Sequence, residues 1–178
     1  FSNKRSRKSW GELIIGFGLL FIGLDFLKNS MPNIQENPAI FTFLKEYTNM
    51  GYASYFLFLL IGTALTILIQ SSSATMALTL VMCANGWIGF EIAAAMVLGE
   101  NIGTTITANI AASVGNTQAK RAAMSHTIFN VFGVLWALAL YKPFLGLVGF
   151  ITATIFGLPD PSAEGFMVSG PNAPEGVA

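Results

Sequence analysis

The feature that most constrains the fold of this sequence is the long stretch between Glu46 and Lys120, which contains only two charged residues, Glu91 and Glu100. Charged residues make up 10% of the whole chain, whereas a soluble domain is about a quarter charged. So few charges cannot cover the surface of a soluble domain. The composition therefore predicts an integral membrane protein, and the net charge of zero gives no field that would attract nucleic acid.

Apolar segments of two lengths alternate along the chain. A helix needs about 20 residues to cross the roughly 30 Å of hydrocarbon in a bilayer. Segments near this length are residues 11–27, 52–69 and 122–141, and shorter ones are residues 74–84, 90–98, 106–114 and 144–158. An all-α protein is expected, because a single segment in lipid satisfies all its backbone polar groups only as a helix. The first segment is expected to remain as a span rather than be cleaved as a signal peptide, since it contains Glu12 and Asp25 and no cleavage site follows.

The short segments meet at two polar interruptions. One is "QSSS", residues 70–73, and the other is "GENIGTT", residues 99–105. Half-length helices that meet at Gly or Ser are typical of re-entrant hairpins and broken helices in transporters. We therefore predict a re-entrant hairpin over residues 52–84, a turn at 85–89, and a helix over 90–114 that breaks at the second interruption.

The basic residues predict the topology. The cluster at residues 4–8 places the N-terminus in the cytoplasm, and the first span then places residues 28–50 outside. If residues 52–84 enter and leave on the outer side, the segment 90–114 crosses inward and the basic pair at 120–121 lies inside. A complete crossing by 52–84 would put that pair outside, so the positive-inside preference favours the hairpin.

The serines of the first interruption lie where two helices are expected to face each other. A helix that ends near Gln70 presents unpaired carbonyls, which suit a cation, and a helix that begins near Ala74 presents unpaired N–H groups, which suit an anion. Hydroxyl groups donate and accept hydrogen bonds, so Ser71, Ser72 and Ser73 can bind either ion. The alternative is that these serines only cap a kinked helix.

The second interruption offers oxygen atoms for a cation. Gly99 and Gly103 are expected to free the backbone, and Asn101, Thr104 and Thr105 supply oxygens, which suit sodium better than a thiophilic metal. Glu100 is either a carboxylate paired at an interface or a functional group of the membrane interior.

Two further polar residues interrupt the span at 122–141. His126 and Asn130 are four residues apart and share a helix face. They predict a hydrogen bond between helices, with substrate or proton handling as the alternative.

The quoted motifs identify a resemblance. "TALTILIQSSSATMALTL", "GENIGTTITANIAA" and "KRAAMSHTIFNVFG" resemble the type II sodium–phosphate cotransporter family, over about residues 8–150. The resemblance implies that phosphate binds at Gln70, Ser71, Ser72 and Ser73. It implies a set of sodium ligands consisting of Ser72, Ser73, Thr75, Asn101, Thr104 and Thr105. Glu100, His126 and Asn130 would be auxiliary residues, and sodium would be the coupling ion, with no other cofactor.

The resemblance also implies an architecture and a location. Members of the family have two inverted repeats with one QSSS hairpin each, and this chain has one such motif, resembling the second repeat. Residues 1–158 are expected to form one half of an inverted-repeat transport domain in the plasma or inner membrane, and residues 159–178 a polar loop or disordered tail. Its partners would be phosphate, sodium, the lipid bilayer and a first repeat, or a second copy of the chain in a homodimer.

Two other functions remain open on the sequence. The first is an intramembrane serine hydrolase that uses a serine of the QSSS motif with His126, although no strained Gly-x-Ser turn supports it. The second is a membrane assembly subunit that transports nothing. Transport rather than an enzymatic activity is the prediction.

Overall fold

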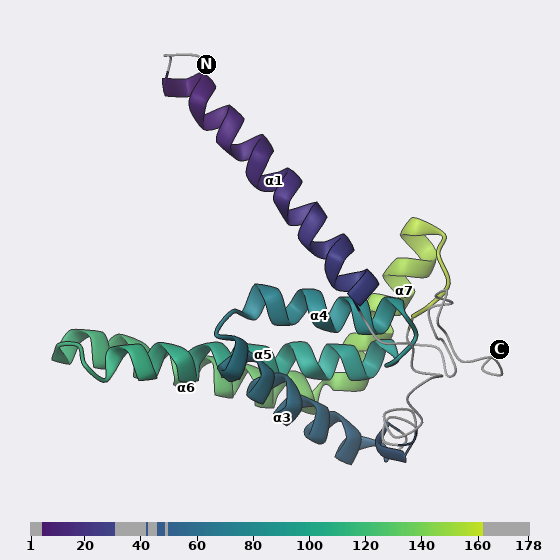
Figure 1. The fold of residues 1–178 in the computed structure, drawn as a ribbon. Helices are drawn as coiled ribbons and strands as arrows, with labels where there is room; N and C mark the ends of the chain where they lie inside the picture. Colours follow the sequence, from purple (N-terminus) through teal and green to yellow (C-terminus); the bar gives the residue numbers. More distant parts are fainter. Residues whose placement is uncertain (1–4, 31–41, 43–45, 49, 162–178) are drawn as a thin grey trace. The chain divides into compact units, whose positions relative to one another are not determined.

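The structure, a computed structural model, describes residues 5–30, 42, 46–48 and 50–161, and the elements in these residues are α-helices (Figure 1). They are α1 (Arg5–Ser30), α3 (Tyr52–Ile69), α4 (Ser72–Ala84), α5 (Phe90–Ala112), α6 (Thr117–Ala139) and α7 (Tyr141–Phe156). The predicted all-α class is confirmed for the described residues.

Three helices are long and apolar enough to cross a membrane. They comprise Lys8–Leu27 of α1, Tyr52–Ile69 of α3 and Thr117–Ala139 of α6. These match the three longer segments predicted from the sequence, within a few residues at each end. The helices α4 and α7 are apolar but shorter. The chain is therefore a multi-pass membrane protein.

The chain divides into two compact units, residues 1–33 and 34–178. The first unit contains α1, whose N-terminal turns carry an ion pair between Lys8 Nζ and Glu12 Oε1 at 3.8 Å. The second unit contains the remaining helices. Within it, α5 is the central element, because α3, α4 and α6 all pack against it.

The contact between α3 and α5 is very close because both helices carry glycine there. A Cβ atom added to Gly62 would lie 2.3 Å from the carbonyl oxygen of Met96, and one added to Gly99 would lie 1.9 Å from that of Leu59. Small residues at an interface let two membrane helices approach so closely. The hydroxyl of Thr63 donates a hydrogen bond across the contact to the carbonyl oxygen of Gly99, at 2.9 Å.

The prediction that the helix over 90–114 breaks at residues 99–105 is wrong. The helix α5 continues without interruption from Phe90 to Ala112. Gly99 and Gly103 do not free the backbone there, because both face α3, and a Cβ on Gly103 would lie 2.6 Å from Cβ of Thr66. The glycines are therefore needed for close packing and not for a change of chain direction.

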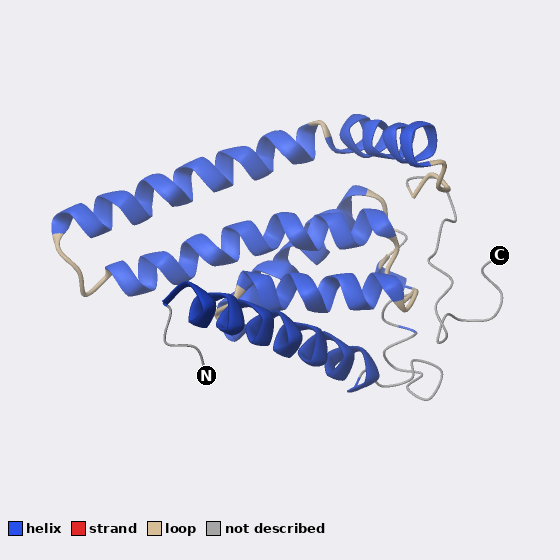
Figure 2. Ribbon diagram, turned by 90° about the horizontal axis from the view of Figure 1, so that it is seen from above, coloured by secondary structure: helices blue, strands red, loops and turns tan. Residues whose placement is uncertain are grey.

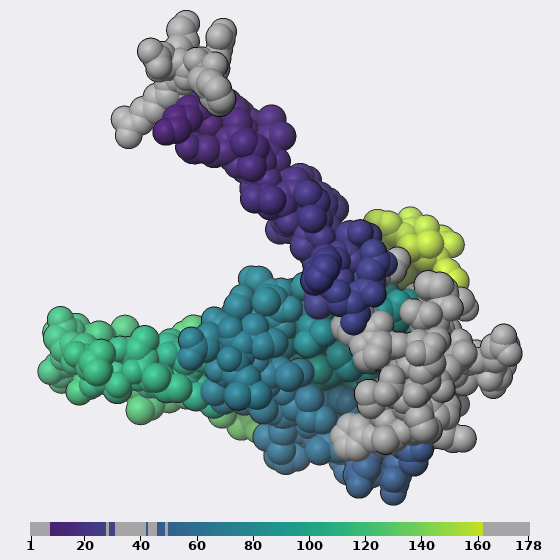
Figure 3. Space-filling view, viewed as in Figure 1, coloured from purple at the N-terminus to yellow at the C-terminus, as the bar shows by residue number. Residues whose placement is uncertain are grey.

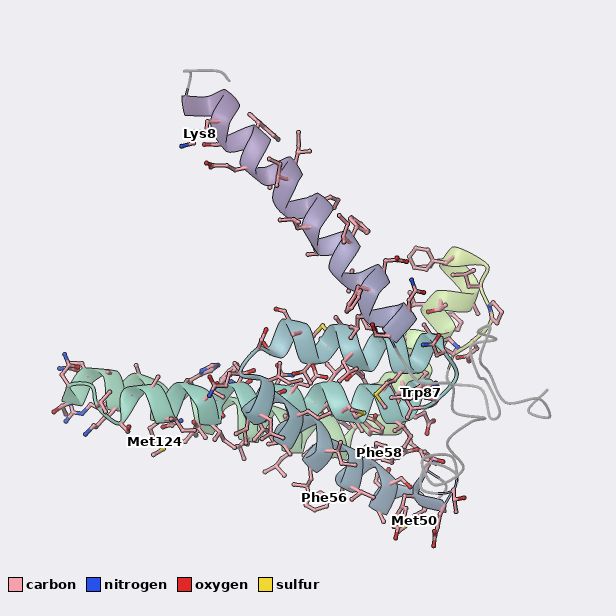
Figure 4. The ribbon with its side chains drawn as sticks, in the orientation of Figure 1. Lys8, Met50, Phe56, Phe58, Trp87 and Met124 are labelled. Carbon is pink, nitrogen blue, oxygen red and sulfur yellow. The ribbon has the colours of Figure 1, made fainter. Side chains whose placement is uncertain are left out.

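One end of the central helix is tied to α3 and α7 by tyrosines. Tyr55 of α3 donates a hydrogen bond to the carboxylate of Glu91, and Tyr141 of α7 donates one to the Glu91 backbone oxygen. The two tyrosine rings also contact each other, with centroids 4.7 Å apart. Farther along α3, Phe58 points into the packed unit and Phe56 points away from it (Figure 4).

The helices α5 and α6 form an antiparallel pair joined by a short loop (Figure 2). Asn109 of α5 links them, because its side-chain nitrogen donates to the hydroxyl of Thr127 on α6. Figure 3 shows the joined ends of this pair, in green, extending beyond the block of atoms formed by α3 and α4. Most large apolar side chains of α6 are exposed in the isolated chain, as expected of a surface that lipid or another protein segment covers.

The turn predicted at residues 85–89 is confirmed as the connection between α4 and α5. It is more buried than a loop of this composition usually is, since Asn85 and Ile88 are each 1% exposed. Gly86 adopts a positive φ of 71° there, as a tight turn requires. The disordered tail predicted for 159–178 lies almost wholly outside the described residues.

Candidate functional site

The connection between α3 and α4 has the form that the sequence predicts. The helix α3 ends at Ile69, and α4 begins at Ser72, so only Gln70 and Ser71 separate them. The backbone N–H of Gln70 closes the last turn of α3 on the carbonyl oxygen of Thr66, at 2.8 Å. The carbonyl end of one helix and the N–H end of the next therefore meet at the QSSS motif.

Ser71 caps the N-terminus of α4. Its hydroxyl oxygen accepts a hydrogen bond from the backbone N–H of Ala74 at 3.3 Å. Side-chain oxygens at this position satisfy one of the unpaired N–H groups of a helix. The capping alternative considered from the sequence therefore describes Ser71, whereas the structure gives Ser72 and Ser73 no such role.

Gln70 has an unusual backbone conformation. Its φ of 58° and ψ of 23° lie in the left-handed region, and it is the one non-glycine residue with a positive φ among the described residues. A side chain in this region costs roughly 1–2 kcal/mol, which glycine would avoid. Such strain often accompanies functional sites. Gln70 is exposed in the isolated chain.

One face of α4 carries buried threonines between the QSSS turn and the contact with α5. Thr75 and Thr79 are four residues apart, and both are fully buried. The hydroxyl of Thr79 donates a hydrogen bond of 2.7 Å to Oε1 of Glu100 on α5. Because α4 and α5 are joined by a short loop and run antiparallel, one further turn along each helix brings Thr75 to the level of Thr104. The two polar motifs thus lie on helices that pack together (Figure 1).

The oxygen-bearing residues of α5 do not share one environment. Asn101 is exposed in the isolated chain, and Thr105 is fully buried. Asn101, Thr104 and Thr105 each donate a side-chain hydrogen bond to a backbone oxygen of α5. The acceptors are the carbonyl oxygens of Val97, Glu100 and Ile102, respectively. Their oxygen lone pairs remain available to a cation, since these bonds use only the hydrogens.

His126 and Asn130 of α6, which were predicted to form a hydrogen bond between helices, are joined to each other within α6. Asn130 donates to the backbone oxygen of His126 at 3.0 Å, so the described hydrogen bond lies within α6 and does not join two helices. His126 itself is exposed in the isolated chain.

Three residues that sequence reasoning missed organise this region. Thr79 binds Glu100, Asn109 joins α5 to α6, and Gly62 lets α3 approach α5. One of them had a detectable signal, because Thr79 follows Thr75 at the four-residue spacing of one helix face. On the other side of the contact that Gly62 makes with α5, Gly99 and Gly103 have the spacing typical of close helix contacts.

Span-length apolar helices and a polar turn between two helices are features that membrane transport proteins share. The sequence model of the Na+/Pi-cotransporter family matches residues 39–158. This match covers more than half of the chain, and the chain belongs to that family.

Individual relatives agree with this assignment. The chain is 34% identical over 161 residues to YqeW of Bacillus subtilis, a protein without a functional name, covering 88% of this chain and 48% of YqeW. It is 28% identical over 138 residues to YjbB of Salmonella typhimurium, which is named for inorganic phosphate export, covering 78% of this chain and 25% of YjbB. It is 40% identical over 89 residues to sodium-dependent phosphate transport protein 2C of Rattus norvegicus, covering 48% of this chain and 15% of that protein.

The chain thus spans about half the length, or less, of the curated relatives it matches. No solved structure matches it significantly.

Proposed function

We propose that this chain is one half of a sodium-coupled inorganic phosphate transporter, with the ions bound at the QSSS turn and beside the facing side of α5. The observation that supports this most is the turn itself. Opposite ends of two helices meet there within two residues, at a row of hydroxyl and amide side chains. Family membership and the phosphate-transport names of the relatives agree with it.

Phosphate would bind at the N-terminal end of α4. The unpaired N–H groups and the partial positive charge of a helix N-terminus favour an anion. Gln70, Ser72 and Ser73 would donate hydrogen bonds from their side chains, while Ser71 holds the helix start in place. The strained backbone of Gln70 supports a functional need for its amide, because glycine would fit the turn at lower cost.

Sodium would neutralise the bound phosphate. No lysine or arginine occurs between Glu46 and Lys120 in the sequence, so the protein has no cationic side chain of its own in this region. Sodium beside the anion lowers the cost of binding phosphate, and phosphate does the same for sodium, which is positive linkage. The proposed ligands are oxygens of Ser72, Ser73, Thr75, Asn101, Thr104 and Thr105.

The complete site would need a second half. One turn surrounds an ion from one side only, and a site of this kind lies at the interface of two repeats. The exposed position of Gln70, Ser71 and Ser73 is consistent with a surface that another repeat covers. That repeat would come from a longer protein or, in a homodimer, from a second copy, and the plasma or inner membrane is the proposed location. Residues 52–84 would then form a re-entrant hairpin.

Phosphate flux in vesicles tests the proposal. Together with a first-repeat partner, the chain is expected to move radiolabelled phosphate when a sodium gradient is present, and little when choline replaces sodium. Efflux from loaded vesicles is measured as well, because one relative is named for export. Labelling of the QSSS serines by a fluorophosphonate probe, without phosphate flux, would favour the hydrolase instead. Family membership argues against that outcome.

A further inference from the structure

The carboxyl group of Glu100 has a feature that the QSSS turn does not explain. Glu100 is 1% exposed. Oε1 accepts the hydrogen bond from Thr79, but Oε2 is buried and accepts none from the part of the chain that the structure describes. A buried carboxylate with an unpartnered oxygen is strongly unfavourable. Either a proton or a partner from outside the described chain is therefore needed at this oxygen.

The helices around Glu100 offer no compensating positive charge within their described residues. The titratable residues of α3 are Tyr52 and Tyr55, and α4 has only Cys83. The cationic or titratable residues of α6, namely Lys120, Arg121 and His126, are all exposed. The other carboxylate of α5, Glu91, already accepts a hydrogen bond from Tyr55.

We propose that Glu100 is a ligand of a sodium ion held between α4 and α5. Oε2 would coordinate the ion, with the hydroxyl oxygen of Thr79 beside it. Thr79 uses its hydrogen toward Oε1 at 2.7 Å, so the lone pairs of its oxygen remain free. Carboxylate and hydroxyl oxygens are ligands that hard cations prefer. Backbone carbonyls or water would complete the coordination.

The position of this ion has a consequence for the transport cycle. Thr75 lies one turn from Thr79 in the direction of the QSSS turn, and both residues are fully buried. Buried oxygens thus extend along α4 from the proposed phosphate site to Glu100. Because the carboxylate supplies its own negative charge, this sodium binds in the absence of phosphate. The choice of sodium as the ion rests on the proposed function.

Sodium-dependent thermal stability tests the site without phosphate. The protein in lipid nanodiscs is melted at increasing sodium, with choline keeping the ionic strength constant. The wild type is expected to be stabilised, because a ligand that binds the folded state raises the melting temperature. Glu100→Gln is expected to need about tenfold more sodium, or to lose the effect, since a charged ligand is removed. Glu91→Gln, the matched control on the same helix, keeps the wild-type response.

Thr79→Val gives a second measurement that does not depend on the charge. It removes one oxygen at nearly constant volume, and the sodium concentration for half-maximal stabilisation is expected to rise. The inference fails if Glu100→Gln keeps the wild-type sodium response. It also fails if infrared spectra at saturating sodium contain the carbonyl band of a protonated carboxylic acid that is absent in Glu100→Gln, because a proton would then occupy Oε2.

Sodium binding and phosphate flux are measured separately, so a failure of the Glu100 site can be told apart from a failure of the proposed transport function. Loss of sodium binding in Glu100→Gln supports the site even if the protein moves no phosphate. Conversely, sodium-driven phosphate flux with unaltered sodium binding in Glu100→Gln supports the transporter and overturns this site.

Discussion

Gly99 of α5 lies directly against the backbone of Leu59 on α3, so close that a Cβ atom on Gly99 would be 1.9 Å from the Leu59 carbonyl oxygen. The hydroxyl of Thr63 bonds to the carbonyl oxygen of the same glycine, at 2.9 Å. Glu100 follows this contact immediately in sequence and turns to the other partner helix, α4, where it meets Thr79. The packing of α3 on one side of α5 therefore positions the polar contact on the other.

Gly99→Ala is expected to destabilise the protein. The added methyl group meets backbone atoms that cannot move aside without separating α3 from α5, and overpacking of this kind costs about 1–3 kcal/mol. Gly133→Ala is the matched control on α6, because a Cβ there would meet nothing within 4 Å. The melting temperatures of the two purified variants provide the test. Equal values for both variants would contradict the close contact.

Gln70→Gly is expected to raise the stability of the chain and to lower phosphate transport by the complete transporter. Glycine relieves the left-handed strain of the turn, which is worth about 1 kcal/mol, but removes the amide proposed to bind phosphate. The reverse change, Gly157→Gln, serves as a control, since Gly157 ends α7 with a similar φ of 62° and is expected to lose stability. Full transport activity in Gln70→Gly would remove the Gln70 side chain from the site.

In the complete transporter, Ser72→Ala and Ser73→Ala are each expected to weaken phosphate transport without preventing membrane insertion. Each change removes one hydrogen-bond donor from the bound anion, at roughly 1–3 kcal/mol, or about 5- to 150-fold in apparent affinity. Ser125→Ala on α6 is the control, because that serine is exposed and lies outside the proposed site. The kinetics of uptake at varied phosphate would show the change as a higher KM. Unchanged kinetics in both variants would place these hydroxyls outside the site.

The proposed topology predicts which positions an impermeant thiol reagent reaches. Cys83, the one cysteine of the chain, is first replaced by alanine. In that background Gln35→Cys is expected to react from outside the cell and Gln118→Cys only after the membrane is permeabilised. Labelling at both 35 and 118 from outside would show that residues 52–84 cross completely. Labelling at 118 from outside, with none at 35, would show that the chain is inverted.

The helix ends at the QSSS motif could be predicted from sequence, because the signal there is local. Four polar residues interrupt a long apolar run, and the chain turns within that interruption, between Ile69 and Ser72. The three span-length helices were predictable for the same reason, since length and hydropathy are sufficient to identify them.

The course of α5 could not be predicted in the same way. Gly99 and Gly103 are compatible both with a broken helix and with close helix packing, and the choice depends on which helix lies opposite them. In this protein α3 lies there, Leu59, Thr63 and Thr66 contact the two glycines, and α5 is continuous. The hydrogen bond from Thr79 to Glu100 likewise depends on the register of two helices, which no local pattern specifies.

The proposed coupling of sodium to phosphate is tested by phosphate uptake into vesicles under an imposed sodium gradient. This chain is reconstituted alone and, in parallel, together with a first-repeat partner from the same family. We expect sodium-dependent uptake by the combined halves, loss of uptake when choline replaces sodium, and little coupled uptake by this chain alone, since one turn encloses the ions from one side only. Robust sodium-driven uptake by the chain alone would contradict the need for a separate first repeat. Uptake by the combined halves that is indifferent to sodium would contradict the proposed coupling.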